Sequence, residues 1–79
     1  MAKILEMAGR ETTIKRLLRK RNTHEYYKED GWTDDPGEAK CFLDVVEVAE
    51  TCVRRRLDNV ELTLRIEAKG CDFFCTPFR

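Results

Sequence analysis

Residues 44–66 join a helical repeat of apolar residues to a strand repeat, and this switch limits the fold more than any other part of the sequence. Asp44 can cap the helix, and Glu47 stands three positions later to return the hydrogen bond. The apolar residues that then recur at three- and four-residue steps are Val45, Val48, Ala49, Cys52, Val53 and Leu57. After a turn the period drops to two, and the apolar side of the strand holds Val60, Leu62, Leu64 and Ile66. A helix stripe followed by a strand face predicts a helix packed on a sheet.

The chain is long enough for one small domain. At 79 residues it can bury one modest core and has little room for an enclosed active site, so we expect a non-enzymatic protein without a cofactor. Lys and Arg number 15 and Asp and Glu also number 15, so no net charge draws the molecule toward nucleic acid or a membrane. The first residues hold too short an apolar run for a signal peptide, and no stretch is long enough to span a bilayer. We therefore expect a cytoplasmic protein that does not bind membranes.

Turn signals divide the rest of the chain into strands. Residues 14–21 fit either a helix or a strand, but the polar turn at Asn22 and Thr23 and the aromatic run after it favour two strands joined as a hairpin. Residues 71–76 alternate as a last strand, which ends at Pro77.

The predicted fold class is α+β, with one main helix packed on an antiparallel sheet of about four strands. The order of elements is ββ-turn-α-ββ. Residues 1–13 form an N-terminal tail or a short helix in this interpretation, and residues 14–79 form a single domain.

Cysteine and histidine residues give no metal or catalytic signal. The cysteines are Cys41, Cys52, Cys71 and Cys75. Cys52 belongs to the helix stripe, and we expect these thiols to be buried as small hydrophobes. Cys71 and Cys75 are too far apart along one strand for a disulfide, and their spacing does not fit a zinc site. His24 is the only histidine, and no nucleophile stands at a readable spacing from it.

The densest charge signal is a basic stripe made of Lys15, Arg16, Arg19, Lys20 and Arg21. Cations beside aromatic residues can hold a phosphate backbone while bases stack on the rings, which predicts nucleic-acid binding as the alternative function. The competing interpretation is a solvated edge strand, because alternating cations keep a strand from pairing with neighbouring molecules.

Aromatic residues indicate a protein-binding surface. Tyr26 and Tyr27 are consecutive on a strand and must point to opposite faces, so we expect one of them to be exposed. Trp32 follows a turn beside them, and the choice for this residue is between a core lid and a recognition platform. Phe74 is expected to point away from the helix on a poorly guarded edge strand. The sequence therefore predicts protein-binding residues at Tyr26, Tyr27, Trp32 and Phe74. It also predicts that residues 71–78 either mediate dimerisation or add as a strand to a partner.

One resemblance covers residues 15–66. The residues that carry it are Tyr26, Tyr27, Gly31, Trp32, Thr33, Asp35, Ala39 and Phe42, followed by the capped helix and the valine-containing strand. This run resembles a pattern found in short uncharacterised bacterial and phage proteins. The resemblance implies a mobile-element or accessory-gene setting, and small inhibitors such as anti-CRISPR proteins are an analogy of size and class. The leading expectation is a protein-binding inhibitor or accessory factor.

Overall fold

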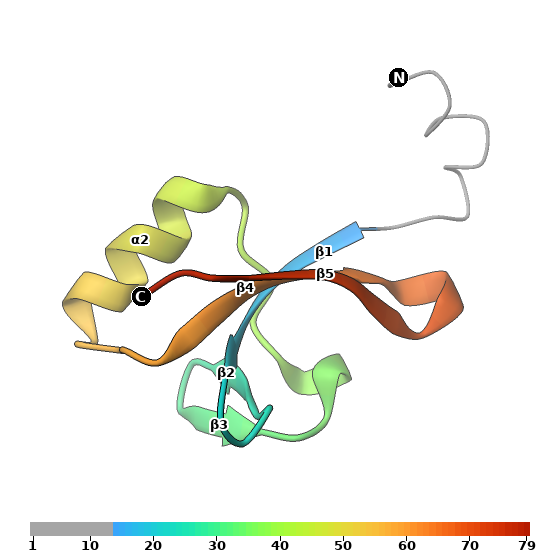
Figure 1. Ribbon diagram of the computed structural model, residues 1–79, viewed down its shortest axis with the longest axis horizontal. Coiled ribbons are helices and arrows are strands. Elements are labelled where there is room, and N and C mark those ends of the chain that lie inside the picture. Colours follow the sequence, from blue (N-terminus) through green and yellow to red (C-terminus); the bar gives the residue numbers. More distant parts are fainter. Residues whose placement is uncertain (1–13) are drawn as a thin grey trace.

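The computed structural model describes residues 14–79, and the expectation of a tail or short helix over residues 1–13 lies outside this part (Figure 1). The elements in chain order are β1 Ile14–Lys20, β2 Tyr26–Lys28, β3 Gly31–Thr33, the 3₁₀ turn η1 Pro36–Glu38, α2 Val45–Arg54, β4 Val60–Ile66, the 3₁₀ turn η2 Glu67–Lys69 and β5 Cys71–Pro77.

The strands of residues 14–79 form one antiparallel sheet with the order β3-β2-β1-β4-β5. The α+β class is confirmed, but the sheet has five strands where about four were expected. The additional strand is β3, which the sequence suggested only as a turn followed by Trp32. It pairs with β2 through Tyr27 and Trp32, and Gly31 opens it with a φ of +150° that other residues rarely adopt.

Strand β1 lies at the centre of the sheet. It pairs with β4 along its whole length, from Ile14 opposite Ile66 to Lys20 opposite Val60, whereas its register with β2 is limited to one pair. The segment after η1 occupies the space beside the first half of β1, because the Phe42 N–H donates to the carbonyl of Arg16 at 2.8 Å. This backbone bond carries the Phe42 ring into the core.

Helix α2 begins as its sequence predicts. The Asp44 carboxylate accepts a hydrogen bond from the Glu47 N–H at 2.9 Å, and the Glu47 carboxylate accepts one from the Leu43 N–H at 2.7 Å. Side chains on one face of the helix, including Val48 and Cys52, are buried against the sheet.

The expected apolar stripe of α2 is only half buried. Val45, Ala49 and Val53 are exposed, contrary to the periodicity argument. At about 100° per residue, Val53 lies about 140° around the helix from Val48, so no single sheet contact can cover both. The apolar arc of this helix is wider than the surface on which it packs.

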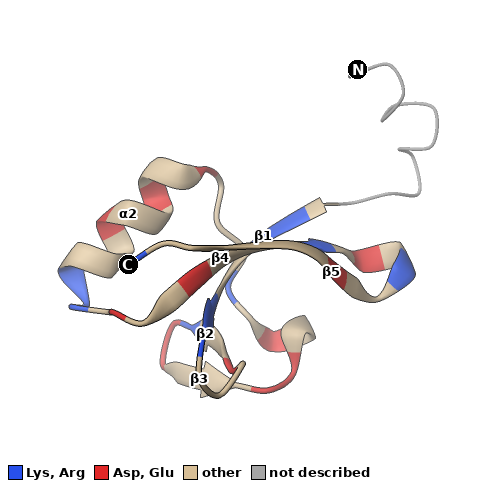
Figure 2. Cartoon of the chain, viewed as in Figure 1, with Lys and Arg blue, Asp and Glu red and all other residues tan. Residues whose placement is uncertain are grey.

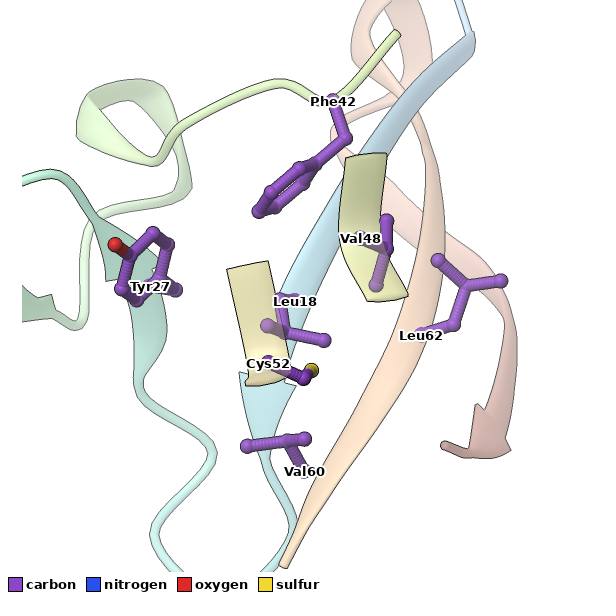
Figure 3. Close-up of a cluster of buried hydrophobic side chains, with 7 residues drawn as sticks. All are labelled: Leu18, Tyr27, Phe42, Val48, Cys52, Val60 and Leu62. Carbon is purple, nitrogen blue, oxygen red and sulfur yellow. The ribbon is translucent and has the colours of Figure 1, made fainter. Parts of the chain in front are cut away.

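The main core fills the space between α2 and the sheet (Figure 3). Its buried residues are Leu18, Tyr27, Phe42, Val48, Cys52, Val60 and Leu62. Trp32, Leu57 and Phe78 pack against its margin. Two residues predicted to face this core, Leu64 and Ile66, are only half-buried, because α2 lies over the other end of β4 (Figure 1).

The sheet curls strongly on the face away from α2. The Tyr26 hydroxyl on β2 donates to the Asp72 carboxylate on β5 at 2.6 Å, although β1 and β4 lie between these strands. In a flat sheet, strands three places apart are separated by about 14 Å, which is beyond the reach of these two side chains. The curl completely buries Leu17 and Thr63, which form a second, smaller interior that the sequence did not predict.

Candidate functional site

The two tyrosines lie on opposite faces of β2 as predicted, but both are buried. Tyr26 is 7% exposed and Tyr27 is 4% exposed, so the expectation that one of them is exposed is wrong. The Tyr27 ring packs against Phe42, with a centroid distance of 6.1 Å, and edge-on against Trp32 at 5.7 Å. Tyr26 is covered on the other face because the curled sheet brings Asp72 over it.

Tyr26 belongs to a network of charged groups that closes the curled face. Arg19 bonds Glu61 through its Nε at 2.7 Å and contacts Asp72 through Nη1 at 3.2 Å. Arg65 donates to the other oxygen of Asp72 at 2.8 Å. Two arginines therefore face two carboxylates, and each of these side chains is less than one fifth exposed. The network neutralises itself, which is typical of a structural clasp rather than a site for a charged ligand.

The electrostatics of this network keep its donors protonated. Burial raises the pKa of Tyr26, and the hydrogen bond to Asp72 raises it further. Burial alone would lower the pKa of Arg19, but the hydrogen bond to Glu61 and the neighbouring acidic groups hold it above its ordinary value. The hydrogen bond to Asp72 likewise raises the pKa of Arg65. At neutral pH the Tyr26 hydroxyl is therefore a donor and both guanidinium groups are cations.

Trp32 lies at the margin of the main core and is half-buried. The Lys20 ammonium stands 4.6 Å from the centre of its ring, which is a cation–π distance. Trp32 thus covers the margin of the main core, and the Lys20 ammonium lies over its ring. A contact between Trp32 and a partner remains a prediction.

Strand alternation splits the predicted basic stripe between two faces. Most of its members also have partners within the domain: Lys15 is 3.3 Å from Glu67, Arg16 donates to the carbonyls of Phe42 and Leu43, Arg19 belongs to the network, and Lys20 covers Trp32. Arg21, in the turn after β1, is exposed. The stripe therefore does not form the continuous basic surface that a phosphate backbone requires.

Exposed arginines gather instead at the end of the molecule where α2 stops. We call this group the arginine end, and its members are Arg21, Arg54, Arg55, Arg56 and Arg79. Backbone hydrogen bonds hold the three segments together, because the Arg21 N–H donates to the Asn59 carbonyl at 2.9 Å and the Asn59 N–H donates to the Arg79 carbonyl at 3.2 Å. Figure 2 shows basic residues at the end of α2 and at the neighbouring chain end. Within residues 14–79, none of these five side chains forms an ion pair.

Phe74 lies on the edge strand β5 and is 48% exposed. Its register partner is Leu64, and cross-strand partners point to the same face, so Phe74 lies on the α2 side of the sheet. The expectation that it points away from the helix is wrong. The reason is a bulge: the register shifts between Leu64 and Arg65, leaving Phe73 as an extra residue that reverses the alternation.

Of the cysteines only Cys52 is buried, so the expectation of buried thiols is wrong for the exposed Cys41, Cys71 and Cys75. Burial raises the pKa of the Cys52 thiol. The Cys75 sulfur lies 3.1 Å from a terminal nitrogen of Arg19. His24 is exposed in a turn, and the part of the chain that the structure describes has no group of three or more residues that could hold a metal ion.

Among the described residues, the large hydrophobic side chains with the highest exposed fractions lie on α2 and just before its cap. Leu43 is 84% exposed, Val53 66% and Val46 63%, and Val45 is also exposed. A shallow hollow between Ala49, Glu50, Val53 and Arg54 lies on this surface. We call the surface formed by Leu43, Val46, Ala49 and Val53 the outer face of α2. Sequence reasoning missed it because the periodicity assigned Ala49 and Val53 to the core, and Val46 was the one signal outside that pattern.

Across residues 14–79, no helix is long and apolar enough to cross a membrane. A scan against protein-family models, a search of curated proteins and a search of solved structures each found no match to this chain.

Proposed function

We propose that this chain is a non-enzymatic protein-binding module that presents the outer face of α2 to an apolar groove on another protein. The observation that carries the proposal is the exposure of Leu43, Val46 and Val53, which are each more than 60% exposed, with Val46 and Val53 on the same side of α2. Contiguous exposed apolar patches of this kind on small proteins typically mark interaction sites.

The spacing on α2 suits recognition by a groove. Val46, Ala49 and Val53 are separated by three and four residues, the pattern by which an amphipathic helix anchors in an apolar groove. Each valine that a partner buries contributes about 1.5 kcal/mol, which the isolated domain does not gain. Glu50 and Arg54 border the hollow and supply a polar rim.

The test compares Val53→Glu with Ala68→Glu, an exposed alanine on η2. Wild type and the two variants each carry a photo-crosslinker on the outer face of α2, and each is used to capture partners from an extract of the source organism. We expect a discrete crosslinked partner with wild type and with Ala68→Glu, and loss of that partner with Val53→Glu. The melting temperatures should agree, because surface substitutions change stability by about 0.5 kcal/mol or less.

Equal crosslinking by Val53→Glu and wild type would contradict the proposal. A marked fall in the melting temperature of Val53→Glu would also contradict it, because Val53 would then serve the fold. The inhibitor or accessory role that the resemblance implies belongs to this proposal, and such a role requires binding alone.

The arginine end supports a second candidate function, nucleic-acid binding, at a place other than the predicted stripe. Its five arginines are exposed and free of ion pairs within residues 14–79, so their guanidinium groups can reach phosphates without breaking an internal contact. The neutral total charge limits attraction at long range, and the binding would therefore be local and weak.

Salt dependence distinguishes this candidate from the first. If phosphates bind at the arginine end, the affinity for a labelled oligonucleotide falls with salt, with a slope of about −0.7 to −0.9 per contacted phosphate. Replacing Arg54, Arg55 and Arg56 with glutamine should flatten that slope, whereas Lys15→Gln, which removes a cation already paired with Glu67, should not. Fluorescence anisotropy at two salt concentrations measures the salt dependence of the affinity for each variant. An unchanged slope in the triple variant would assign the binding to other residues.

A further inference from the structure

The two edges of the sheet differ in length and protection. One edge is β3, which has three residues, and the other is β5, which has seven. A long edge strand presents unpaired N–H and C=O groups to which another strand can add. Among the described residues, β5 is paired on one side only, with β4.

Charge does not guard β5. Its one charged residue is Asp72, and the Asp72 side chain is 11% exposed because Arg19, Arg65 and Tyr26 hold it on the curled face. The usual deterrent to edge pairing is a charge that a second strand would have to bury. On β5 that charge is already satisfied inside the domain.

Exposed apolar groups accompany this edge. Phe73 and Phe74 on β5 are each 48% exposed, and Ile14 at the start of β1 is 41% exposed. Leu64 and Ile66 lie half-buried between them on β4. Helix α2 lies over the other end of β4 (Figure 1), and these side chains are left partly exposed.

Backbone hydrogen bonds define which groups of β5 are free. The Phe78 N–H donates to the Val60 carbonyl, so in the alternation of an antiparallel pair Thr76 and Phe74 also direct their N–H and C=O groups toward β4. Cys75 and Pro77 direct theirs toward the free edge. Cys75 therefore offers a donor and an acceptor to an added strand, and Pro77 offers an acceptor alone.

We propose that β5 pairs antiparallel with β5 of a second copy of this chain, about a two-fold axis at Phe74. Phe74 is the central residue of Cys71–Pro77, and this register sets Phe73 beside Cys75 of the second copy; the bulge at Phe73 confines regular pairing to the residues next to the axis. The register places Asp72 opposite Thr76 of the second copy, so no like charges meet.

The proposed pairing brings the two Phe74 rings together. Because Phe74 is a hydrogen-bonded residue toward β4, it is a non-hydrogen-bonded residue toward the second copy, where Cα atoms lie about 4.5 Å apart. The rings and the adjoining Ile14 and Leu64 then form one apolar patch across the dimer. The interface does not include the outer face of α2, so it is independent of the proposed partner binding.

Two variants test the pairing through different properties. Phe74→Lys places two ammonium groups face to face, and Cys75→Pro removes the outward N–H without touching a hydrogen bond to β4. Sedimentation equilibrium in the presence of a reductant should give wild type a mass that rises with concentration toward twice 9.3 kDa. Both variants should stay at the monomer mass, and Val53→Glu should behave as wild type. Circular dichroism should show the same folded spectrum for all four proteins.

The register is tested by a disulfide. With Cys41, Cys71 and Cys75 replaced by serine, Phe74→Cys should form an interchain disulfide under mild oxidation, because the Cα separation suits one. Ala68→Cys in the same background should form none. A wild-type protein that remains strictly monomeric, or a dimer that survives both Phe74→Lys and Cys75→Pro, would overturn the proposal.

Discussion

Replacing Leu18 with alanine is expected to lower the free energy of unfolding by about 2–5 kcal/mol. Leu18 is 0% exposed at the centre of the main core, on the strand that joins the two halves of the sheet. Small domains have a total stability toward the lower end of about 5–15 kcal/mol, so this one substitution should leave much of the protein unfolded at 37 °C. Urea denaturation followed by circular dichroism measures the loss.

Leu64→Ala is the matched control for Leu18→Ala. The sequence predicts Leu64 to be inward-facing, but Leu64 is half-buried beyond the end of α2. Its truncation should therefore cost clearly less. Equal losses in the two variants would show that the core extends farther along β4 than the structure indicates.

Asp72→Ala is expected to destabilise the domain by about 2–4 kcal/mol, slightly below the range for breaking a fully buried ion pair. This substitution removes the acceptor for Arg19, Arg65 and the Tyr26 hydroxyl at once, and it leaves two guanidinium groups with less compensation. Thermal unfolding should show a lower midpoint. Asp30→Ala provides the comparison, because Asp30 is 84% exposed in its pair with Lys28 and should contribute less than about 1 kcal/mol.

The pH dependence gives a second measure of the Asp72 network. The pKa of Tyr26 is raised above 10.0 first by burial and then by Asp72, so the folded state holds the phenol proton more tightly than the unfolded chain. The stability from this difference is present below pH 10 and is lost as the pH rises through the raised pKa. In the Asp72→Ala variant, the free energy of unfolding should fall less steeply as the pH rises above 10. If the free energy of unfolding fell equally steeply with rising pH in both proteins, Asp72 would not be a cause of the raised pKa of Tyr26.

Local rules account for the elements that the sequence predicts well. The Asp44 cap and the change of period after it place α2 and β4 because both depend on residues a few positions apart. The half-exposed stripe of α2 shows the limit of such rules. Periodicity identifies an apolar arc, but how much of that arc is covered depends on the width of the sheet, which β1 and β4 set from opposite ends of the chain.

The candidate site was harder to predict because it depends on the curl of the sheet and on a bulge. Alternation correctly separates Tyr26 from Tyr27, but only the curl brings Asp72 over Tyr26 and buries it. The extra residue Phe73 reverses the face on which Phe74 lies, and nothing in the local pattern signals that insertion. The arginine end likewise joins Arg21 to residues far along the chain through backbone bonds to Asn59.

The central position of β1 imposes an order of assembly on the folding chain. β4 and β5 are joined by a short connection and can pair early, whereas β1 must close most of the chain's length to place Ile14 opposite Ile66. Loop closure costs more entropy over longer separations, so we expect β1 to join late and to limit the folding rate. Until it does, the β4–β5 hairpin exposes two free edges, and this interval is when the protein is most open to aggregation and to a chaperone.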